Sequence, residues 1–171
     1  MRVIARGVRV TIRAMSTLRW QWCTLHELSA KELYAVLVAR SAVFVVEQNC
    51  AYQDADGYDL DAEHVTVWLD GDVAAYLRVL APETKFTERS IGRVITTQAF
   101  RGTGLGRKLV AHALARLDAA FPAEPLRIGA QARLKVFYES FGFHQASDVY
   151  MEDGIPHIEM LRTPPAAASP A

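Results

Sequence analysis

The chain has 171 residues and a hydrophobic fraction of 51%, enough for one globular domain that buries its core without disulfides or metals. The formal net charge is zero, so the surplus of positive charge typical of nucleic-acid-binding proteins is missing. No apolar run approaches the length of about 18 residues that a membrane-spanning helix requires. We therefore expect neither a nucleic-acid partner nor a membrane partner.

The charges are unevenly distributed. The arginines before the first acidic residue, Glu27, are Arg2, Arg6, Arg9, Arg13 and Arg19. Removing these five from the 19 basic residues leaves 14 against 19 acidic ones, so the rest of the chain is acidic. We expect residues 1–15 to be disordered or an extension upstream of a start at Met15, and the Pro- and Ala-rich tail 164–171 to be disordered. The predicted domain spans residues 16–163.

The two cysteines, Cys23 and Cys50, form no disulfide framework and no C-x-x-C pair. We expect reduced thiols in a cytoplasmic protein.

The first half of the chain predicts a strand, a helix and a hairpin. Ser29 and Glu32 form a capping-box pattern for a helix that ends near Phe44. The tripeptide 70–72, Asp-Gly-Asp, is typical of a hairpin turn. The predicted elements are a strand at 20–25, the helix from Ser29, a loop at 48–63 and strands at 64–69 and 73–80.

The second half predicts strands alternating with helices. Apolar residues recur at helical spacing over 104–120 and 132–141, and Gly142 is a typical residue beyond a helix end. Strands are predicted at 91–97, 126–129, 143–150 and 157–161. The resulting order, β-α-β-β-β-α-β-α-β-β, indicates an α/β domain with a mixed sheet and helices on its faces.

The predicted loop at 48–63 is rich in acids: Asp54, Asp56, Asp59, Asp61 and Glu63. The spacing does not fit a calcium-binding EF-hand loop, and we expect no metal. Two interpretations stay open. The loop is a solvated acidic segment, or it attracts a cationic amine substrate.

The sequence RGTGLG at 101–106 follows a predicted strand and opens a predicted helix. Free N–H groups and the positive end of the helix dipole suit a pyrophosphate there, and glycines let phosphates approach the backbone. A tight turn without a ligand is the alternative. The spacing fits neither the Walker nor the dinucleotide-binding pattern.

This pattern, R-x-x-G-x-G, resembles the pyrophosphate loop of the GNAT acyltransferase superfamily. The segment FYESFGF at 137–143 resembles a second landmark of that superfamily, and the segments VFVVEQNC at 43–50 and EDGIPH at 152–157 resemble its ElaA-like branch. The resemblance covers residues 20–162. It implies a mixed, mostly antiparallel sheet flanked by helices on both faces, with acetyl-CoA as cosubstrate.

The resemblance also implies roles for individual residues. The backbone of Val94, Ile95 and Thr96 would pair with the pantetheine arm of CoA. The pyrophosphate would be held by Arg101, Gly102, Thr103, Gly104, Leu105 and Gly106.

Three residues are candidates for the chemistry. Tyr138 matches the tyrosine that protonates the CoA thiolate in the superfamily, although its helical spacing also fits a packing role. We expect Glu47 to contact the substrate. Either His64 or Glu47 is a candidate general base, and a water chain, as in many superfamily members, is the alternative.

The expected function is transfer of an acetyl group from acetyl-CoA to a primary amine, by direct attack on the thioester. The acceptor would be a small molecule or a peptide, and the protein a monomer or homodimer. The alternative is a non-catalytic CoA-binding sensor or interaction module, which would keep the glycine turn but gain nothing from a tyrosine beside the thiol.

Overall fold

The computed structural model describes residues 17–164. The prediction for residues 1–15 lies outside this range, as does the prediction for the tail 164–171 except for Pro164. The strands are β1 (Arg19–Thr24), β2 (Glu63–Leu69), β3 (Asp72–Leu80), β4 (Arg89–Thr96), β5 (Leu126–Gln131), β6 (His144–Gln145), β7 (Tyr150–Glu152) and β8 (Ile155–Arg162). The α-helices are α1 (Ala30–Ser41), α2 (Leu105–Ala120) and α3 (Lys135–Glu139). A π-helical segment, Ala42–Glu47, continues α1, and short 3-10 turns lie at Leu25–Glu27, Gln98–Phe100 and Ala132–Leu134.

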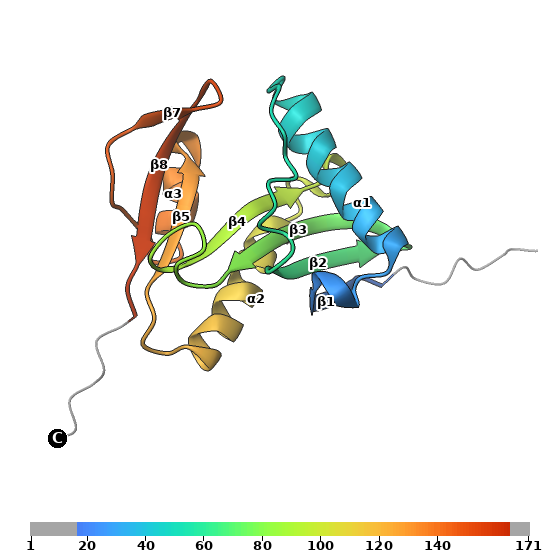
Figure 1. Ribbon diagram of the computed structural model, residues 1–171, viewed down its shortest axis with the longest axis horizontal. Helices are drawn as coiled ribbons and strands as arrows, with labels where there is room; N and C mark the ends of the chain where they lie inside the picture. Colours follow the sequence, from blue (N-terminus) through green and yellow to red (C-terminus); the bar gives the residue numbers. More distant parts are fainter. Residues whose placement is uncertain (1–16, 165–171) are drawn as a thin grey trace, which may run out of the picture.

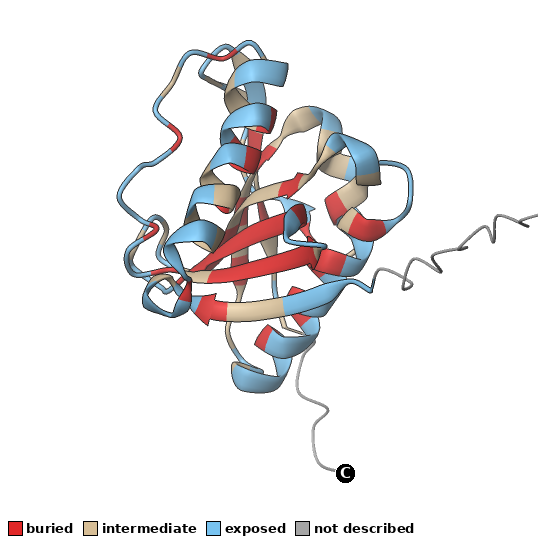
Figure 2. Cartoon of the chain, turned by 90° about the vertical axis from the view of Figure 1, so that its right-hand side faces the viewer, coloured by how far each residue is buried: buried red, intermediate tan, exposed pale blue. Residues whose placement is uncertain are grey.

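Within the described residues the strands form one sheet in the order β1-β2-β3-β4-β5-β8-β6, with β7 paired to β8 (Figure 1). The pairing between β4 and β5 is parallel, and the other pairings are antiparallel. Apolar side chains of α2 and α3 join those of the sheet in one core cluster, whereas α1 packs in a second cluster with Trp68, Tyr76 and Ile95. The buried residues accordingly follow the strands and the inner sides of the helices (Figure 2). The predicted fold class, a mixed and mostly antiparallel sheet with helices on both faces, is confirmed.

Two predicted elements differ from the structure. The strand expected at 143–150 is wrong, because β6 ends at Gln145 and β7 begins at Tyr150. Between them the side-chain oxygen of Ser147 accepts the backbone N–H of Glu159, so a side chain takes the place of a backbone partner. The helix expected at 132–141 begins as a 3-10 turn and is α-helical only over Lys135–Glu139. Its predicted stop is confirmed, since Gly142 has a φ of 86°.

Helix α1 begins with the predicted capping box. The Ser29 hydroxyl accepts the Glu32 N–H at 3.3 Å, and the Glu32 carboxylate accepts the Ser29 N–H at 3.0 Å. The helix does not stop near Phe44 as expected, because the π-helical turn extends it to Glu47. This extension carries Glu47 to the part of the sheet where β4 and β5 separate.

The strands β4 and β5 are paired only at their first residues. Arg89 lies opposite Leu126 and Ser90 opposite Arg127, and beyond these pairs the strands diverge (Figure 1). On its other side, β4 carries a bulge, since Tyr76 pairs with Ile95 but Arg78 pairs with Gly92. The backbone of Arg93 has a φ of 52° at this bulge. From Ile91 onward, β4 therefore has an edge without a β5 partner.

The acidic loop before β2 is held by three arginines. Arg40 of α1 donates to Asp54 and Asp59 at 2.8 and 2.7 Å. The remaining ion pairs join Arg78 to Asp56 and Asp59, and Arg93 to Asp54 and Asp56, at 2.6 to 3.1 Å. We call these six residues the Arg–Asp network.

The network accounts for three of the five carboxylates of the acidic loop, Asp54, Asp56 and Asp59. Asp54 and Asp59 are buried, so this part of the loop is not a solvated segment. Three arginines balance the three aspartates of the network, so these carboxylates are not free to attract a cationic substrate. The loop is a structural element that ties α1 to β3 and to the bulge of β4.

The arginines also set the ionisation of the loop. Burial acts to raise the pKa of Asp56, but hydrogen bonds and charge from Arg78 and Arg93 outweigh it and hold the pKa at about 2. Burial also acts to raise the pKa of Asp59, but hydrogen bonds and charge from Arg40 and Arg78 outweigh it and leave the pKa below its usual range. Both carboxylates are therefore ionised at any pH above about 5.

Replacing Asp59 by asparagine should destabilise the protein strongly. Asp59→Asn removes the charge shared by Arg40 and Arg78 and leaves an excess of buried positive charge, which should lower the free energy of unfolding by about 3 kcal/mol. Urea denaturation measures this value. In the control, Asp118→Asn breaks the pair with Arg162 where the aspartate is 48% exposed, and should cost less than about 1 kcal/mol. Equal losses in the two variants would contradict a structural role for the network.

The network should also give the protein an acid-labile component. Because the pKa of Asp56 is lower in the folded chain than in the unfolded chain, its stabilisation is complete above about pH 5 and is lost as pH falls through about 4 to 2. Urea titrations at several pH values should show this decline in wild type. Asp56→Asn should show a shallower decline from a lower plateau.

Candidate active site

A cavity of about 720 Å³ lies between the diverging strands β4 and β5. Its walls come mainly from β4, β5, the π-helical segment with the loop that follows it, and the region of β7, β8 and their turn. The lining is completed by Arg78, Lys85, Phe86, Arg101, Arg133, Leu134 and Tyr138. Of the predicted site residues, it brings together Glu47, Val94, Ile95, Thr96, Arg101 and Tyr138. The volume lies in the range of pockets that enclose a small organic ligand.

The β4 wall offers backbone groups to a ligand. Beyond Ser90 this strand has β3 on one side and no β5 pairing on the other. Unpaired backbone N–H and C=O groups on a strand edge bind an extended chain that carries amide groups. The edge at Val94–Thr96 is therefore suited to the amides of a pantetheine arm.

The glycine turn lies where the end of β4 meets the start of α2. Gly104 is the N-cap residue of α2, with a φ of 80° and no side-chain cap, and Gly102 has a φ of 76°. A Cβ built on either glycine would meet nothing within 4 Å, so the space above the turn is open. A Cβ on Gly106 would instead lie 2.9 Å from Oγ1 of Thr96. Gly102 and Gly104 thus leave space for a ligand beside the free N–H groups at the start of α2. Gly106 lets the helix pack closely on β4.

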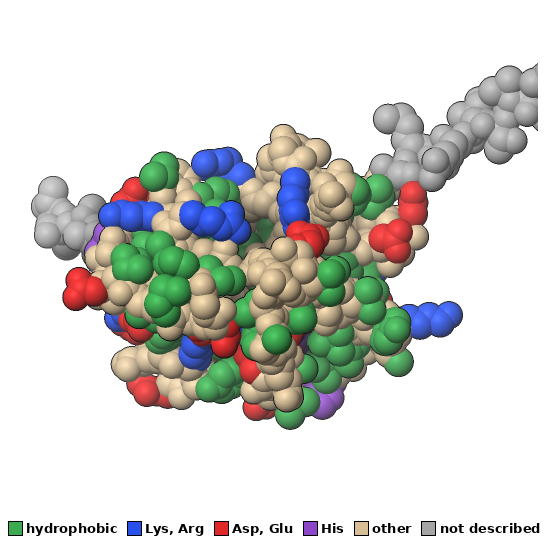
Figure 3. All heavy atoms as spheres, turned by 90° about the horizontal axis from the view of Figure 1, so that it is seen from above, with side chains coloured by type: hydrophobic (Ala, Val, Ile, Leu, Met, Phe, Trp, Pro, Cys, Tyr) green, Lys and Arg blue, Asp and Glu red, His purple; other side chains and the backbone are tan. Residues whose placement is uncertain are grey.

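The side chains of the turn stabilise it and leave its N–H groups to a ligand. Thr103 donates its hydroxyl to the carbonyl of Phe100 at 2.7 Å, and Leu105 is buried in the core. Arg101 donates to the carbonyl of Thr96 and pairs with Glu47 at 2.5 Å. Seen from above, Lys and Arg side chains gather along one margin beside a hollow (Figure 3), which favours an anionic ligand.

Tyr138 projects from α3 into an apolar part of the cavity. Its ring makes edge contacts with Phe137 and Phe143, at centroid distances of 5.0 and 6.0 Å. Within residues 17–164 its hydroxyl has no hydrogen-bond partner, although the residue is 6% exposed and lines the cavity. Burial raises the pKa of Tyr138 to about 12. The phenol is therefore protonated at physiological pH and free to donate to a ligand atom.

Glu47 lies at the end of the π-helical segment. Its carboxylate pairs with Arg101, and both side chains remain partly exposed at the cavity wall. The pair joins the segment after α1 to the end of β4. Glu47 thus lies at the cavity wall, but its charge is paired with that of Arg101.

His64 lies away from the cavity. It is fully buried on β2, and its two ring nitrogens contact the Tyr76 hydroxyl at 2.7 Å and the Asp59 carbonyl at 3.0 Å. Burial lowers the pKa of His64, which favours the neutral ring. This position favours a structural role beside the Arg–Asp network over the role of general base.

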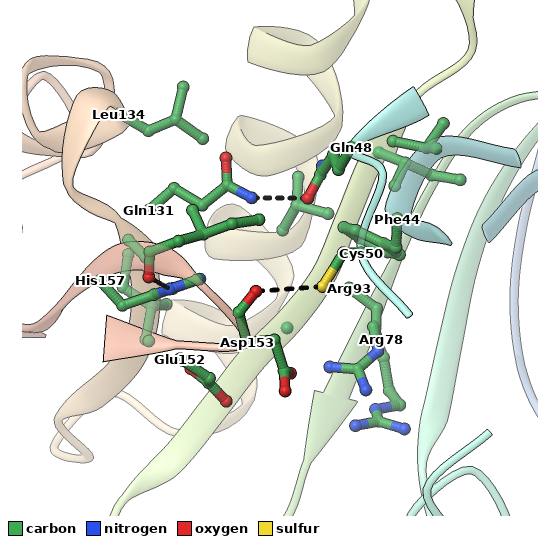
Figure 4. A pocket seen from close by; sticks show the side chains of 18 of the residues that line it. Phe44, Gln48, Cys50, Arg78, Arg93, Gln131, Leu134, Glu152, Asp153 and His157 are labelled. Atoms are coloured by element: carbon green, nitrogen blue, oxygen red, sulfur yellow. Dashed lines mark hydrogen bonds between the residues drawn. The ribbon is translucent and has the colours of Figure 1, made fainter. Parts of the chain in front are cut away.

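Several cavity residues were missed by the sequence analysis. Figure 4 shows Gln48 and Gln131 joined by a hydrogen bond of 2.9 Å, and Cys50 donating to the carbonyl of Asp153 at 3.3 Å. The partners lie 83 and 103 positions apart in sequence, so no local pattern could pair them. We call these two hydrogen bonds the cavity bridges, because each joins the loop after α1 to the half of the sheet that begins with β5.

No group of three or more His, Cys, Asp or Glu side chains in residues 17–164 is arranged to hold a metal ion. None of the helices in this range has the length and apolar character needed to span a bilayer.

Comparisons with known proteins agree with this architecture. The acetyltransferase (GNAT) domain family matches residues 29–163. Protein ElaA of Escherichia coli is 47% identical over 146 residues, which cover 83% of this chain and 95% of ElaA. The crystal structure of ElaA matches with a TM-score of 0.80 and 45% identity, covering 85% of this chain and 99% of that one.

A solved acyl-CoA N-acyltransferase from Pseudomonas aeruginosa matches with a TM-score of 0.81 and 44% identity, over 86% of this chain and all of that one. The similarity extends over most of this chain. The stretch that matches the family, residues 29–163, includes the diverging strands, the glycine turn and the buried tyrosine. The chain belongs to the GNAT acetyltransferase family, in its ElaA-like branch.

Proposed function

We propose that the protein transfers an acetyl group from acetyl-CoA to a primary amine, by direct attack of the amine on the thioester. One observation carries the proposal. The phenol of Tyr138, which has no hydrogen-bond partner within residues 17–164, faces the same cavity as the unpaired edge of β4. A module that only bound CoA would need the strand edge and the glycine turn, but not a proton donor inside the cavity.

The binding elements are consistent with a CoA thioester. The N–H groups at the start of α2 would receive the pyrophosphate, and the edge at Val94–Thr96 would pair with the pantetheine amides. A backbone N–H of β4 would polarise the thioester carbonyl. The long, narrow cofactor would then lead from the turn into the cavity that Tyr138 lines.

The chemistry requires little beyond positioning and proton transfer. The amine nitrogen attacks the carbonyl carbon, a C–N bond forms, and the C–S bond breaks as the thiolate leaves. Tyr138 donates first a hydrogen bond and then its proton to that sulfur. Desolvation favours the neutral thiol over the thiolate, so the departing sulfur accepts a proton more readily inside the cavity.

The cysteines agree with a cytoplasmic location. Cys23 and Cys50 are both unpaired and buried, and unpaired thiols are typical of a reducing compartment. These thiols support a cytoplasmic location for the proposed reaction.

The direct test is release of free CoA thiol from acetyl-CoA in the presence of a panel of primary amines. Amine-dependent release by the wild type would support the proposed transfer. Tight binding of acetyl-CoA without release, for every amine, would favour a binding module instead.

Removal of the Tyr138 hydroxyl should impair turnover without preventing cofactor binding. Tyr138→Phe keeps the ring and its contacts with Phe137 and Phe143, so the melting temperature and the Kd for acetyl-CoA should change little. The value of kcat should fall by roughly 10²–10⁴, the usual contribution of a positioned acid. Steady-state kinetics and calorimetry on the same samples measure these quantities. Wild-type kcat in the variant would remove Tyr138 from the mechanism.

A side chain on Gly104 should weaken CoA binding. Gly104→Ala places a methyl group in the open space above the turn and strains the backbone, because φ is 80° there. The matched control is Gly71→Ala, at a φ of 93° in the β2–β3 turn, where the methyl group also meets nothing. Both variants should lose about 1 kcal/mol of stability. Calorimetry with CoA should show at least a tenfold weaker Kd for the first variant only.

A further inference from the structure

His157 lies on the cavity wall that β5 and β8 form. It is opposite Gln131 of β5 and opposite Tyr150 of β7 in the sheet, and residues paired in this way point to the same face. Gln131 joins the cavity bridge to Gln48 on that face. Figure 4 shows His157 on the side of the cavity opposite Phe44 and Arg93. The imidazole therefore faces the space between the two halves of the sheet.

One hydrogen bond sets the tautomer of the ring. Nδ1 of His157 lies 2.9 Å from the carbonyl oxygen of Ile155. A carbonyl oxygen can only accept, so Nδ1 carries the hydrogen of the neutral ring. Within the described chain Nε2 has no hydrogen-bond partner. Its lone pair is available to take a proton from a ligand.

The other basic groups of the cavity are less available. Glu47 pairs with Arg101, Asp56 pairs with Arg78 and Arg93, and Glu152 lies 3.8 Å from Lys85. The Asp153 side chain is exposed at the turn between β7 and β8. The charged residues that line the cavity with His157 are Glu47, Asp56, Arg78, Lys85, Arg93, Arg101, Arg133, Glu152 and Asp153. An imidazole titrates nearer to neutrality than a carboxylate and is the better match for a general base.

We propose that His157 is the general base that takes the proton from the acceptor amine. The inference rests on the proposed acetyl transfer and adds a residue to it. Nε2 of His157 takes one proton from the ammonium form of the acceptor, and the neutral amine nitrogen then forms its bond to the carbonyl carbon and loses a second proton to solvent. The C–S bond breaks, and Tyr138 of α3 supplies a proton to the sulfur. Solvent then restores both residues, because the imidazolium releases the proton it gained and the phenolate takes one up.

The test compares His157→Asn with the wild type, using acetyl-CoA and four simple primary amines: ethanolamine, tyramine, lysine amide and spermidine. Asparagine can keep a donor near the Ile155 carbonyl but cannot act as a base at this pH. The value of kcat/KM for the amine should fall by about 10²–10⁴ near neutral pH, with little change in the Kd for acetyl-CoA. The matched control is His144→Asn, an exposed histidine on β6 outside the cavity lining, which should behave as wild type.

The pH dependence separates a base from a structural residue. Toward pH ~10, where an alkylamine is increasingly deprotonated without help, the activity of His157→Asn should approach that of wild type. A residue that only holds the strand would give the same relative loss at every pH. Chemical-shift measurements on ¹⁵N-labelled histidine should also show Nδ1 protonated and Nε2 unprotonated in the neutral ring of His157.

Two results would overturn the base role while leaving the proposed function intact. These are near-wild-type turnover in His157→Asn, and an Nε2–H tautomer in an enzyme that acetylates the amines. Turnover lost in Asp153→Asn but kept in His157→Asn would assign the role to the carboxylate. No amine-dependent thiol release by the wild type would reject the proposed function, and the base role with it.

Discussion

The candidate site depends on how little of β4 is paired with β5. The two strands are paired in parallel only through Arg89 with Leu126 and Ser90 with Arg127. Beyond these pairs a gap separates β4 from β5, and the backbone hydrogen bonds of the sheet do not cross it. Full pairing would fill the space of about 720 Å³ with neighbouring strands and satisfy the backbone of β4. Because the strands diverge, backbone N–H and C=O groups of β4 that would have paired with β5 can instead bind a ligand.

Such a gap has to be kept open by other parts of the fold. On the β4 side this is done by the Arg–Asp network, which links the end of α1, the loop before β2 and the bulge at Arg93. The positive φ of Arg93 directs a guanidinium toward Asp54 from a strand position. The paired charges of the Arg–Asp network therefore stabilise the fold. The electrostatic potential in the cavity is set by the charged side chains outside these pairs.

Local patterns predicted most of the fold but only part of the site. The capping box at Ser29, the hairpin turn at 70–72 and the stop at Gly142 each follow from short-range geometry, and the structure has them. The break at Ser147 was not predictable, because its cause is a hydrogen bond to Glu159 on another strand. Tyr138, the glycine turn and His157 all belong to contiguous motifs, but the segment at 152–157 gave His157 no role, because that residue faces the cavity through its register with Gln131 on another strand.

The cavity bridges have a consequence for how a ligand could enter the cavity. One is a hydrogen bond between two neutral amides and the other a thiol–carbonyl contact, so each contributes about 1 kcal/mol or less. Breaking both then costs about 2 kcal/mol, which corresponds to an open population of a few per cent at room temperature. The two sides joined by the bridges would separate and rejoin as a rapid equilibrium, and the loop after α1 would need no refolding. An acceptor that forms replacement hydrogen bonds with Gln48 and Gln131 would shift that equilibrium as it binds.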